Sequence, residues 1–147
     1  FGFTEIGTVT PRPQLGNPRP RLWRSDGELS LFNRMGFNNE GAEVVAGRVR
    51  RARERGKIRD AFKIGVSVGK NKDTPLEQAA SDYLKAVQPF RDGVDMVVLN
   101  VSSPNTEKLR SLQTVSHLLP ILERVRTELA GWKSMPALWI KLAPELS

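Results

Sequence analysis

The chain has 147 residues, and its 23 lysines and arginines against 16 acidic residues give a formal net charge of +7. This length suits one domain, the absence of cysteine excludes disulfides, thiolate metal sites and a cysteine nucleophile, and the single histidine excludes a metal site built from several histidines. No apolar run approaches the ~20 residues of a membrane-spanning helix, and the positive charge leaves nucleic acid, an anionic membrane surface and anionic small substrates as candidate partners.

The first expected elements are a strand and an excursion away from it. Phe3–Thr10 mixes apolar residues with threonines, which predicts a strand. Because Phe1 starts the chain just before this strand, without an initiator methionine, we expect a piece of a longer protein. Pro11–Pro20 holds four prolines, so neither a helix nor a central strand fits there. Residues 21–32 surround the turn Ser25-Asp26-Gly27 and predict a small hairpin outside the main sheet.

The next segment predicts an arginine-rich helix. Asn38 or Asn39 is placed to cap it and Gly56 to end it. Its apolar residues recur at helical spacing, at Ala42, Val45, Val49 and Ala52. Five arginines lie between Arg48 and Arg55, and we interpret them as a solvated outer face, with a nucleic-acid-binding stripe as the alternative.

A second strand and helix follow. Phe62–Val68 predicts the strand, which gives way to the polar segment Gly69-Lys70-Asn71-Lys72. We expect Thr74 to be the N-cap of the helix, with Pro75 as its first residue and Glu77 completing a capping box. The residues expected on its buried stripe are Leu76, Ala80, Tyr83, Leu84 and Val87.

The third strand is an apolar run that turns abruptly polar. Residues 96–99 are consecutively apolar, which suits a strand of a parallel sheet that is covered on both faces. Hydroxyl and carboxamide side chains follow it at Asn100, Ser102, Ser103, Asn105 and Thr106. A third helix is expected over Val115–Ala130, with Pro120 in its first turn or kinking it, and a fourth strand over Ala137–Leu142.

Alternating strands and helices favour a parallel α/β sheet with right-handed crossovers, either doubly wound or part of a (β/α)8 barrel. Neither G-x-G-x-x-G nor the Walker pattern occurs, which disfavours a doubly wound dinucleotide-binding fold. The topology brings the polar ends of the strands to one rim, where α/β enzymes keep their chemistry. These ends are Thr8, residues 70–72, residues 100–106 and Lys141.

His117 and Lys141 each have two competing interpretations. Ser102 and Ser103 lie outside a G-x-S-x-G elbow, and His117 on a helix favours a surface or capping role over a Ser-His-Asp hydrolase. Lys141 either pairs with Glu145 as a surface lysine or binds an anion or cofactor.

Several long segments together resemble the class 2, quinone-linked dihydroorotate dehydrogenases. They are Glu5–Gln14 with Gly16–Arg21, Asn33–Asn39, Gly69–Lys72, Asn100–Thr106 with Leu109–Gln113, and Lys141–Pro144. The resemblance implies a (β/α)8 TIM barrel with FMN at its carboxyl rim, of which residues 1–147 would be one domain, incomplete at both ends and containing about strands two to five.

The resemblance also implies roles for individual residues. Ser103 would be the base that removes the C5 proton of dihydroorotate while hydride passes from C6 to the flavin N5, and serine at this position points to the quinone-linked class. The residues implied to hold the substrate are Asn33, Arg34, Met35, Gly36, Phe37, Asn100 and Asn105. Those implied to contact FMN are Thr8, Ser67, Asn100 and Lys141, and no metal is implied.

The implied reaction oxidises dihydroorotate to orotate in de novo pyrimidine biosynthesis, with a quinone as electron acceptor through a further N-terminal segment. The full-length flavoprotein would be peripheral to the bacterial cytoplasmic or mitochondrial inner membrane, without nucleic acid. Ser67 replaces the family's usual asparagine, and Glu107-Lys108 replaces its usual Pro-Gly. We expect these four strands to need the rest of the barrel and to be inactive alone, because they leave two sheet edges unpaired.

Overall fold

The computed structural model describes residues 2–59, 61–106 and 109–144. Its strands are β1 (Phe3–Val9), β2 (Leu22–Ser25), β3 (Ser30–Asn33), β4 (Lys63–Val68), β5 (Met96–Asn100) and β6 (Ala137–Lys141). Its α-helices are α1 (Ala42–Glu54), α2 (Ala79–Val87) and α3 (Val115–Ala130), and its short 3-10 helices are η1 (Leu76–Gln78), η2 (Gln88–Phe90) and η3 (Leu109–Gln113). The predicted strands and the exact bounds of the third helix are confirmed.

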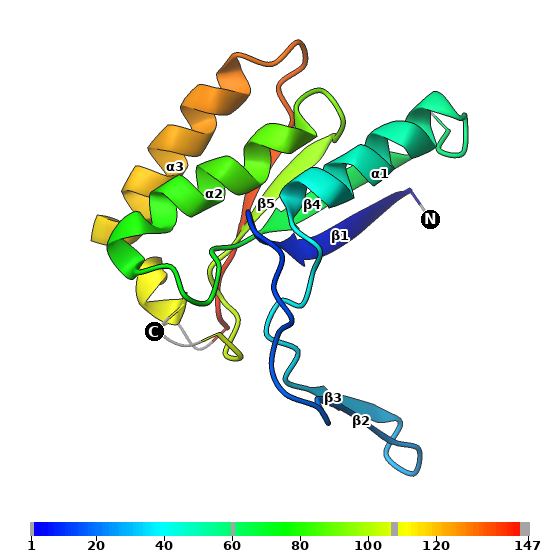
Figure 1. The fold of residues 1–147 in the computed structure, drawn as a ribbon, viewed down its shortest axis with the longest axis vertical. Helices are drawn as coiled ribbons and strands as arrows, with labels where there is room; N and C mark the ends of the chain where they lie inside the picture. The colour runs from blue at the N-terminus through cyan, green and yellow to red at the C-terminus, as the bar shows by residue number, and fades with distance from the viewer. Residues whose placement is uncertain (1, 60, 107–108, 145–147) are drawn as a thin grey trace.

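A parallel sheet of four strands in the order β1-β4-β5-β6 forms the centre, and the three α-helices cover one of its faces (Figure 1). Alternate residues of the central strands, such as Val66 and Leu99, face these helices and are fully buried. From the helices, Tyr83 and Val125 pack into the same core. The expectation of a parallel α/β sheet is therefore confirmed.

The opposite face of the sheet carries no helix within the described residues. Glu5 and Gly65 pair in register on β1 and β4, and Val98 pairs with Trp139 on β5 and β6, so these residues share that face. Trp139 is 58% exposed although it is aromatic. Such a face is apolar at its centre and open at its edges, as the inner face of a partial barrel would be.

The predicted cap of α1 is wrong. The helix begins after Gly41, whose φ of +87° suits glycine, and no side chain caps it. Asn39 is engaged elsewhere, because its Oδ1 accepts hydrogen bonds from the backbone N–H groups of Gly41 at 2.8 Å and Thr10 at 3.2 Å. Gly56 ends the helix as predicted, with a φ of +63°.

The predicted capping box at the second helix is also wrong. η1 begins after Pro75, and α2 follows it directly. The hydroxyl of Thr74, which was expected to cap the helix, instead donates to Asp82 Oδ2 at 2.6 Å, a carboxylate within α2. A buried ionic acceptor competes well with backbone N–H groups at a helix start.

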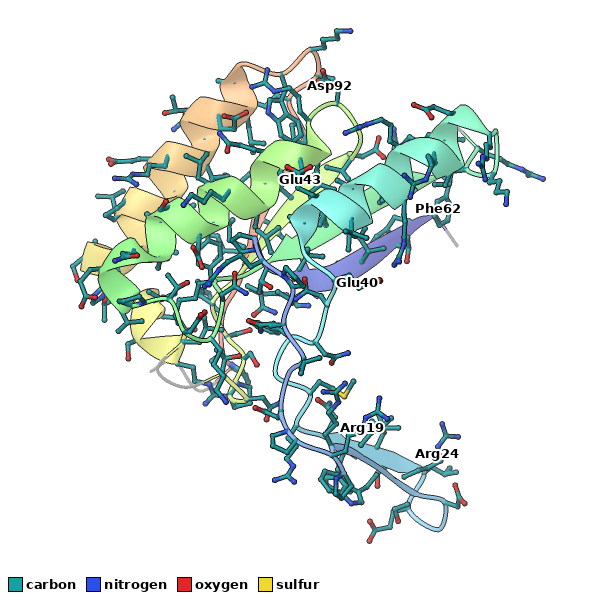
Figure 2. The ribbon with its side chains drawn as sticks, viewed as in Figure 1. Arg19, Arg24, Glu40, Glu43, Phe62 and Asp92 are labelled. Atoms are coloured by element: carbon teal, nitrogen blue, oxygen red, sulfur yellow. The ribbon has the colours of Figure 1, made fainter. Side chains whose placement is uncertain are left out.

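The predicted hairpin is confirmed and projects away from the sheet, as Figure 1 shows. β2 and β3 pair antiparallel, with Trp23 opposite Phe32, and Arg34 lies over the Trp23 ring at 5.5 Å from its centroid. Figure 2 shows Arg19 and Arg24 on this projection. The hairpin leaves the sheet beside the carboxyl end of β1, so its base borders the predicted functional rim.

Candidate active site at the carboxyl edge of the sheet

Side chains from three strands meet where the parallel strands end. Asn100 Nδ2 donates to Thr8 Oγ1 at 2.8 Å, and Thr8 Oγ1 lies 3.0 Å from Ser67 Oγ. Lys141 pairs in register with Asn100 on the neighbouring strand. The structure therefore brings the four predicted cofactor-contacting residues to one edge, with Ser67 buried beneath Thr8.

Lys141 forms an ion pair that joins the two outer strands of the sheet. Its Nζ lies 2.9 Å from Glu5 Oε1, and the two strands, β6 and β1, are the first and last in the sheet. The ammonium is thus held over the helix-free face. The alternative partner considered for it, Glu145, lies outside the described residues.

A pocket of about 310 Å³ opens beside this edge. It is lined by Gly7, Thr8, Asn33, Met35, Gly36, Phe37, Asn38, Ser103 and Asn105. Most of the predicted substrate-binding residues therefore share one cavity with the predicted base. Segments that lie far apart in the sequence form its two sides.

Ser102 and Ser103 have different surroundings. β5 ends at Asn100, whose Oδ1 accepts hydrogen bonds from the backbone N–H and the hydroxyl of Ser102, both at 3.2 Å. Ser103 lines the pocket, and its Oγ accepts the N–H of Asn105 at 3.2 Å. Strand alternation alone predicts that Asn100 and Ser102 share a face, and their side chains are indeed hydrogen-bonded. The chain leaves the strand after Asn100, however, and Ser103 lines the pocket.

The backbone of Asn100 is held from below by α2. Tyr83 is fully buried and its hydroxyl donates to the Asn100 carbonyl at 2.7 Å. Burial, with a smaller contribution from the negative charge of Asp82, raises the pKa of Tyr83 far above its ordinary value. The hydroxyl therefore stays protonated and remains a donor at any physiological pH.

Arg34 is not among the residues that line the pocket, although its neighbours Asn33 and Met35 are. Its guanidinium donates twice to the Pro20 carbonyl, at 3.0 and 3.1 Å, and lies on Trp23 away from the pocket. The loop that it begins turns through Gly36 and Phe37, which have φ values of +72° and +55°. These left-handed residues direct the loop over the pocket.

A buried polar network that the sequence did not predict fixes the loops around the site. Asn71 Nδ2 lies 2.9 to 3.1 Å from Thr10 Oγ1, the Arg12 carbonyl and Gln14 Oε1, which share its two hydrogens, and Oδ1 accepts the Arg12 N–H at 3.0 Å. Asp82 in turn accepts the backbone N–H of Asn71 at 2.9 Å. The Asn71 side chain thus anchors the proline-rich segment to the end of β4.

The arginines of α1 are largely engaged within the chain. Arg48 pairs with Glu40, Arg53 donates to Asp95 and to the Gly93 carbonyl, and Arg50 donates to a backbone carbonyl. This arrangement is typical of a solvated helix face rather than a surface kept free for phosphates.

His117 lies in the first turn of α3, with Nδ1 2.8 Å from Thr114 Oγ1. This position suits the surface role that its place in the sequence predicts.

A larger cavity, of about 890 Å³, opens at the amino edge of the sheet and is lined by residues such as Phe3, Met96 and Trp139. In its lining, Asp95 accepts from both Arg53 and Lys63, and Asp92 accepts the backbone N–H of Lys133 at 3.0 Å. With a mostly apolar lining, it resembles unfilled space against the helix-free face. The smaller pocket at the carboxyl edge is the better candidate for chemistry.

None of the helices among the described residues is both long and apolar enough to cross a membrane. Within the same residues, no group of three or more histidine, cysteine or acidic side chains could hold a metal ion.

Comparison with known proteins gives a consistent result. The family model for dihydroorotate dehydrogenase matches residues 1–147. The chain is 52% identical over 147 residues to a dihydroorotate dehydrogenase (quinone) of Thermus thermophilus, covering all of this chain and 40% of the relative. It is 49% identical over 146 residues to the protein of that name from a Synechococcus species, covering 99% of this chain and 37% of the relative.

The crystal structure of DHODH from Eimeria tenella in complex with ferulenol matches with a TM-score of 0.90 at 37% identity, covering all of this chain and 44% of that one. The chain therefore spans about two fifths of the length of the proteins it matches.

Proposed function

The chain belongs to the dihydroorotate dehydrogenase family, and from this premise we propose that its protein oxidises (S)-dihydroorotate to orotate for pyrimidine biosynthesis and passes the electrons to a quinone. One observation supports this most directly. The pocket of about 310 Å³ gathers Ser103, Asn33 and Asn105 beside Thr8 at the carboxyl edge of a parallel sheet. It combines a hydroxyl that can act as base with carboxamides that can hold a pyrimidine.

Ser103 is proposed as the base that removes the C5 proton of the substrate. A serine hydroxyl is a very weak base, so it needs a closed, dry site and stabilisation of the oxygen as it loses its own proton. The Asn105 N–H donates to Ser103 Oγ at 3.2 Å. This hydrogen bond would become stronger as negative charge develops on Oγ. That hydrogen bond leaves the hydroxyl proton of Ser103 free to pass to a relay.

The carboxamides of Asn33 and Asn105 are proposed to hold the pyrimidine ring. Each offers both a donor and an acceptor, which matches the alternating N–H and C=O groups of dihydroorotate. The backbone of residues 35–37, which line the pocket, would supply further polar groups. Asn100 is proposed to contact both substrate and cofactor, since its carboxamide reaches Thr8 at the strand ends.

The residues at the rim fit an FMN. Hydroxyl and carboxamide groups on Thr8 and Asn100 both donate and accept, as the edge of a flavin ring requires, and Lys141 adds a cation. FMN bound there would supply the hydride acceptor of the reaction. Lys141 would stabilise negative charge on the reduced cofactor, with Glu5 holding its ammonium in place. Ser67, whose Oγ is hydrogen-bonded to Thr8 Oγ1, would position the Thr8 hydroxyl.

The proposed activity depends on the rest of a (β/α)8 barrel. The helix-free face and the outer strands β1 and β6, which have no second strand neighbour among the described residues, support closure by further strands. We propose that residues 1–147 are inactive alone, that a further segment carries electrons to the quinone, and that the protein works at a membrane surface.

The test uses protein produced from its complete reading frame. We expect yellow protein with flavin absorbance that reduces a quinone analogue only when dihydroorotate is present. Folded, colourless protein that cannot take up added FMN would overturn the proposal. Salt-sensitive nucleic-acid binding by the same preparation would favour the alternative of a basic binding module.

A further inference from the structure

The carboxamide of Asn17 lies between the two segments that form the sides of the pocket. Its Nδ2 donates to the Arg34 carbonyl at 3.0 Å and to the Asn105 carbonyl at 3.1 Å. An amide nitrogen has two hydrogens, so both are used. Within the part of the chain that the structure describes, this is the one hydrogen bond between residues 11–39 and residues 101–106.

One side of this link is firmly anchored. The Asn17 N–H donates to the Met35 carbonyl at 3.0 Å, and Gln14 and Asn39 exchange backbone hydrogen bonds at 3.0 Å. Gly36 packs directly on the carboxamide, because a Cβ added there would lie only 2.8 Å from Asn17 Cγ. The proline-rich segment and the loop over the pocket therefore form one unit that carries the Asn17 side chain.

The other side is held to the sheet and to η3 by hydrogen bonds at Ser102, and to the opposite wall by this link at Asn105. Residues 101–106 leave β5 without regular secondary structure. Ser103 and Asn105 are joined to each other by the hydrogen bond between Ser103 Oγ and the Asn105 N–H. Fixing the Asn105 carbonyl from across the pocket therefore also fixes the distance between Ser103 and the opposite wall.

We infer that Asn17 is a positioning residue that sets the width of the substrate pocket by clamping the segment of Ser103 and Asn105 to the loop at Arg34. This inference rests on the proposed function of the pocket. Both hydrogen bonds that the Asn17 side chain donates go to main-chain carbonyl oxygens, so it has no role in proton transfer. Aspartate at this position would have the same shape but no donors, and its charge would repel both carbonyls.

The test compares Asn17→Asp, Asn17→Ala and the milder Asn17→Ser in protein from the complete reading frame. The matched control is Gln78→Glu, which makes the same amide-to-carboxylate change at an exposed site away from the pocket. Losing two hydrogen bonds to main-chain carbonyls should lower kcat/KM for dihydroorotate and weaken orotate binding by about 5- to 100-fold, while FMN content stays unchanged.

A second measurement does not depend on activity. Hydrogen exchange at the Asn105 amide should become at least about fivefold faster in the Asn17 variants and stay unchanged in the control. Orotate affinity and Asn105 exchange both equal to those of the control would overturn the clamp. If the unaltered protein fails to bind orotate, the proposed function fails, and the exchange rate at Asn105 alone then decides whether Asn17 holds the two segments together.

Discussion

Asp95 fastens the amino edge of the sheet to α1, and its substitution should separate stability from activity. Its Oδ2 accepts the Ile64 N–H at 2.9 Å and Arg53 Nη2 at 2.7 Å, and its Oδ1 accepts Lys63 Nζ at 3.1 Å. All three contacts lie at the opposite end of the strands from the pocket. We therefore expect Asp95→Asn to lower the free energy of unfolding without changing turnover.

The size of the loss follows from the exposure of each partner. The Lys63 side chain is 60% exposed, so its contact contributes close to nothing. Arg53 and Asp95 are 25% and 28% exposed, so that pair contributes roughly 1 kcal/mol after screening. The N–H of buried Ile64 adds about 1 to 2 kcal/mol if it loses its acceptor. We expect a loss of about 2 to 3 kcal/mol for Asp95→Ala and about 1 to 2 kcal/mol for Asp95→Asn, which keeps one acceptor oxygen.

The effect should depend on pH in a defined direction. Burial acts to raise the pKa of Asp95, but hydrogen bonds from the Ile64 N–H, Lys63 and Arg53 outweigh it and hold the pKa below its ordinary value of 3.8. The stabilisation by the carboxylate is therefore fully present above that ordinary value and is lost as the pH falls through the lower pKa of the folded state.

The assay is urea denaturation of protein from the complete reading frame at several pH values between about 7 and 3. The stability difference between the unaltered protein and Asp95→Asn should be constant near neutral pH and shrink below about pH 4. Glu123→Gln, at an exposed position on α3, is the matched control and should change stability by less than about 0.5 kcal/mol. A difference that does not vary with pH, or a severalfold loss of kcat/KM, would refute this account of Asp95.

Two further substitutions test the support of the rim. In Tyr83→Phe the Asn100 carbonyl loses a buried donor while the ring still fills its place. The free energy of unfolding, measured by denaturation, should fall by about 1 kcal/mol and kcat/KM should fall a few-fold. Unchanged values would show that this hydrogen bond does not support the rim. Glu5→Gln should raise the flavin midpoint potential in a redox titration by on the order of tens of millivolts, because a negative charge beside Lys141 is removed; a potential equal to that of the unaltered protein would show that this ion pair is not near the flavin.

Much of the fold is predictable because its signals are periodic. The apolar runs of β4 and β5 and the spacing of Ile121, Val125 and Leu129 in α3 specify parallel strands under helices. The caps are not predictable in the same way, because each capping side chain has a tertiary alternative. Thr74 donates to the carboxylate of Asp82, eight residues further on in α2, and Asn39 accepts from the backbone of Thr10, 29 residues away.

The same distinction applies to the candidate site, where some contacts follow from the sheet topology and others arise only in the folded chain. Strand ends in a parallel sheet must share an edge, so the convergence of Thr8, Asn100 and Lys141 follows from topology. The pairing of Lys141 with Glu5 depends on how strongly the sheet curves, since the two residues lie on its outermost strands. Asn17 sits in a proline-rich segment with no periodic pattern, and only the folded chain brings its carboxamide to Asn105.

The most direct measurement of the central claim is the rate at which dihydroorotate bleaches the flavin of the complete protein in anaerobic stopped-flow mixing. With Ser103→Ala, bleaching should be about 10² to 10⁴ times slower, the usual contribution of a general base, which is the role proposed for this serine, while FMN content stays unchanged and orotate affinity stays within about threefold. A slowing of less than about tenfold, with C–H cleavage shown to be rate-limiting by deuterium at C5, would contradict the assignment of Ser103 as the base.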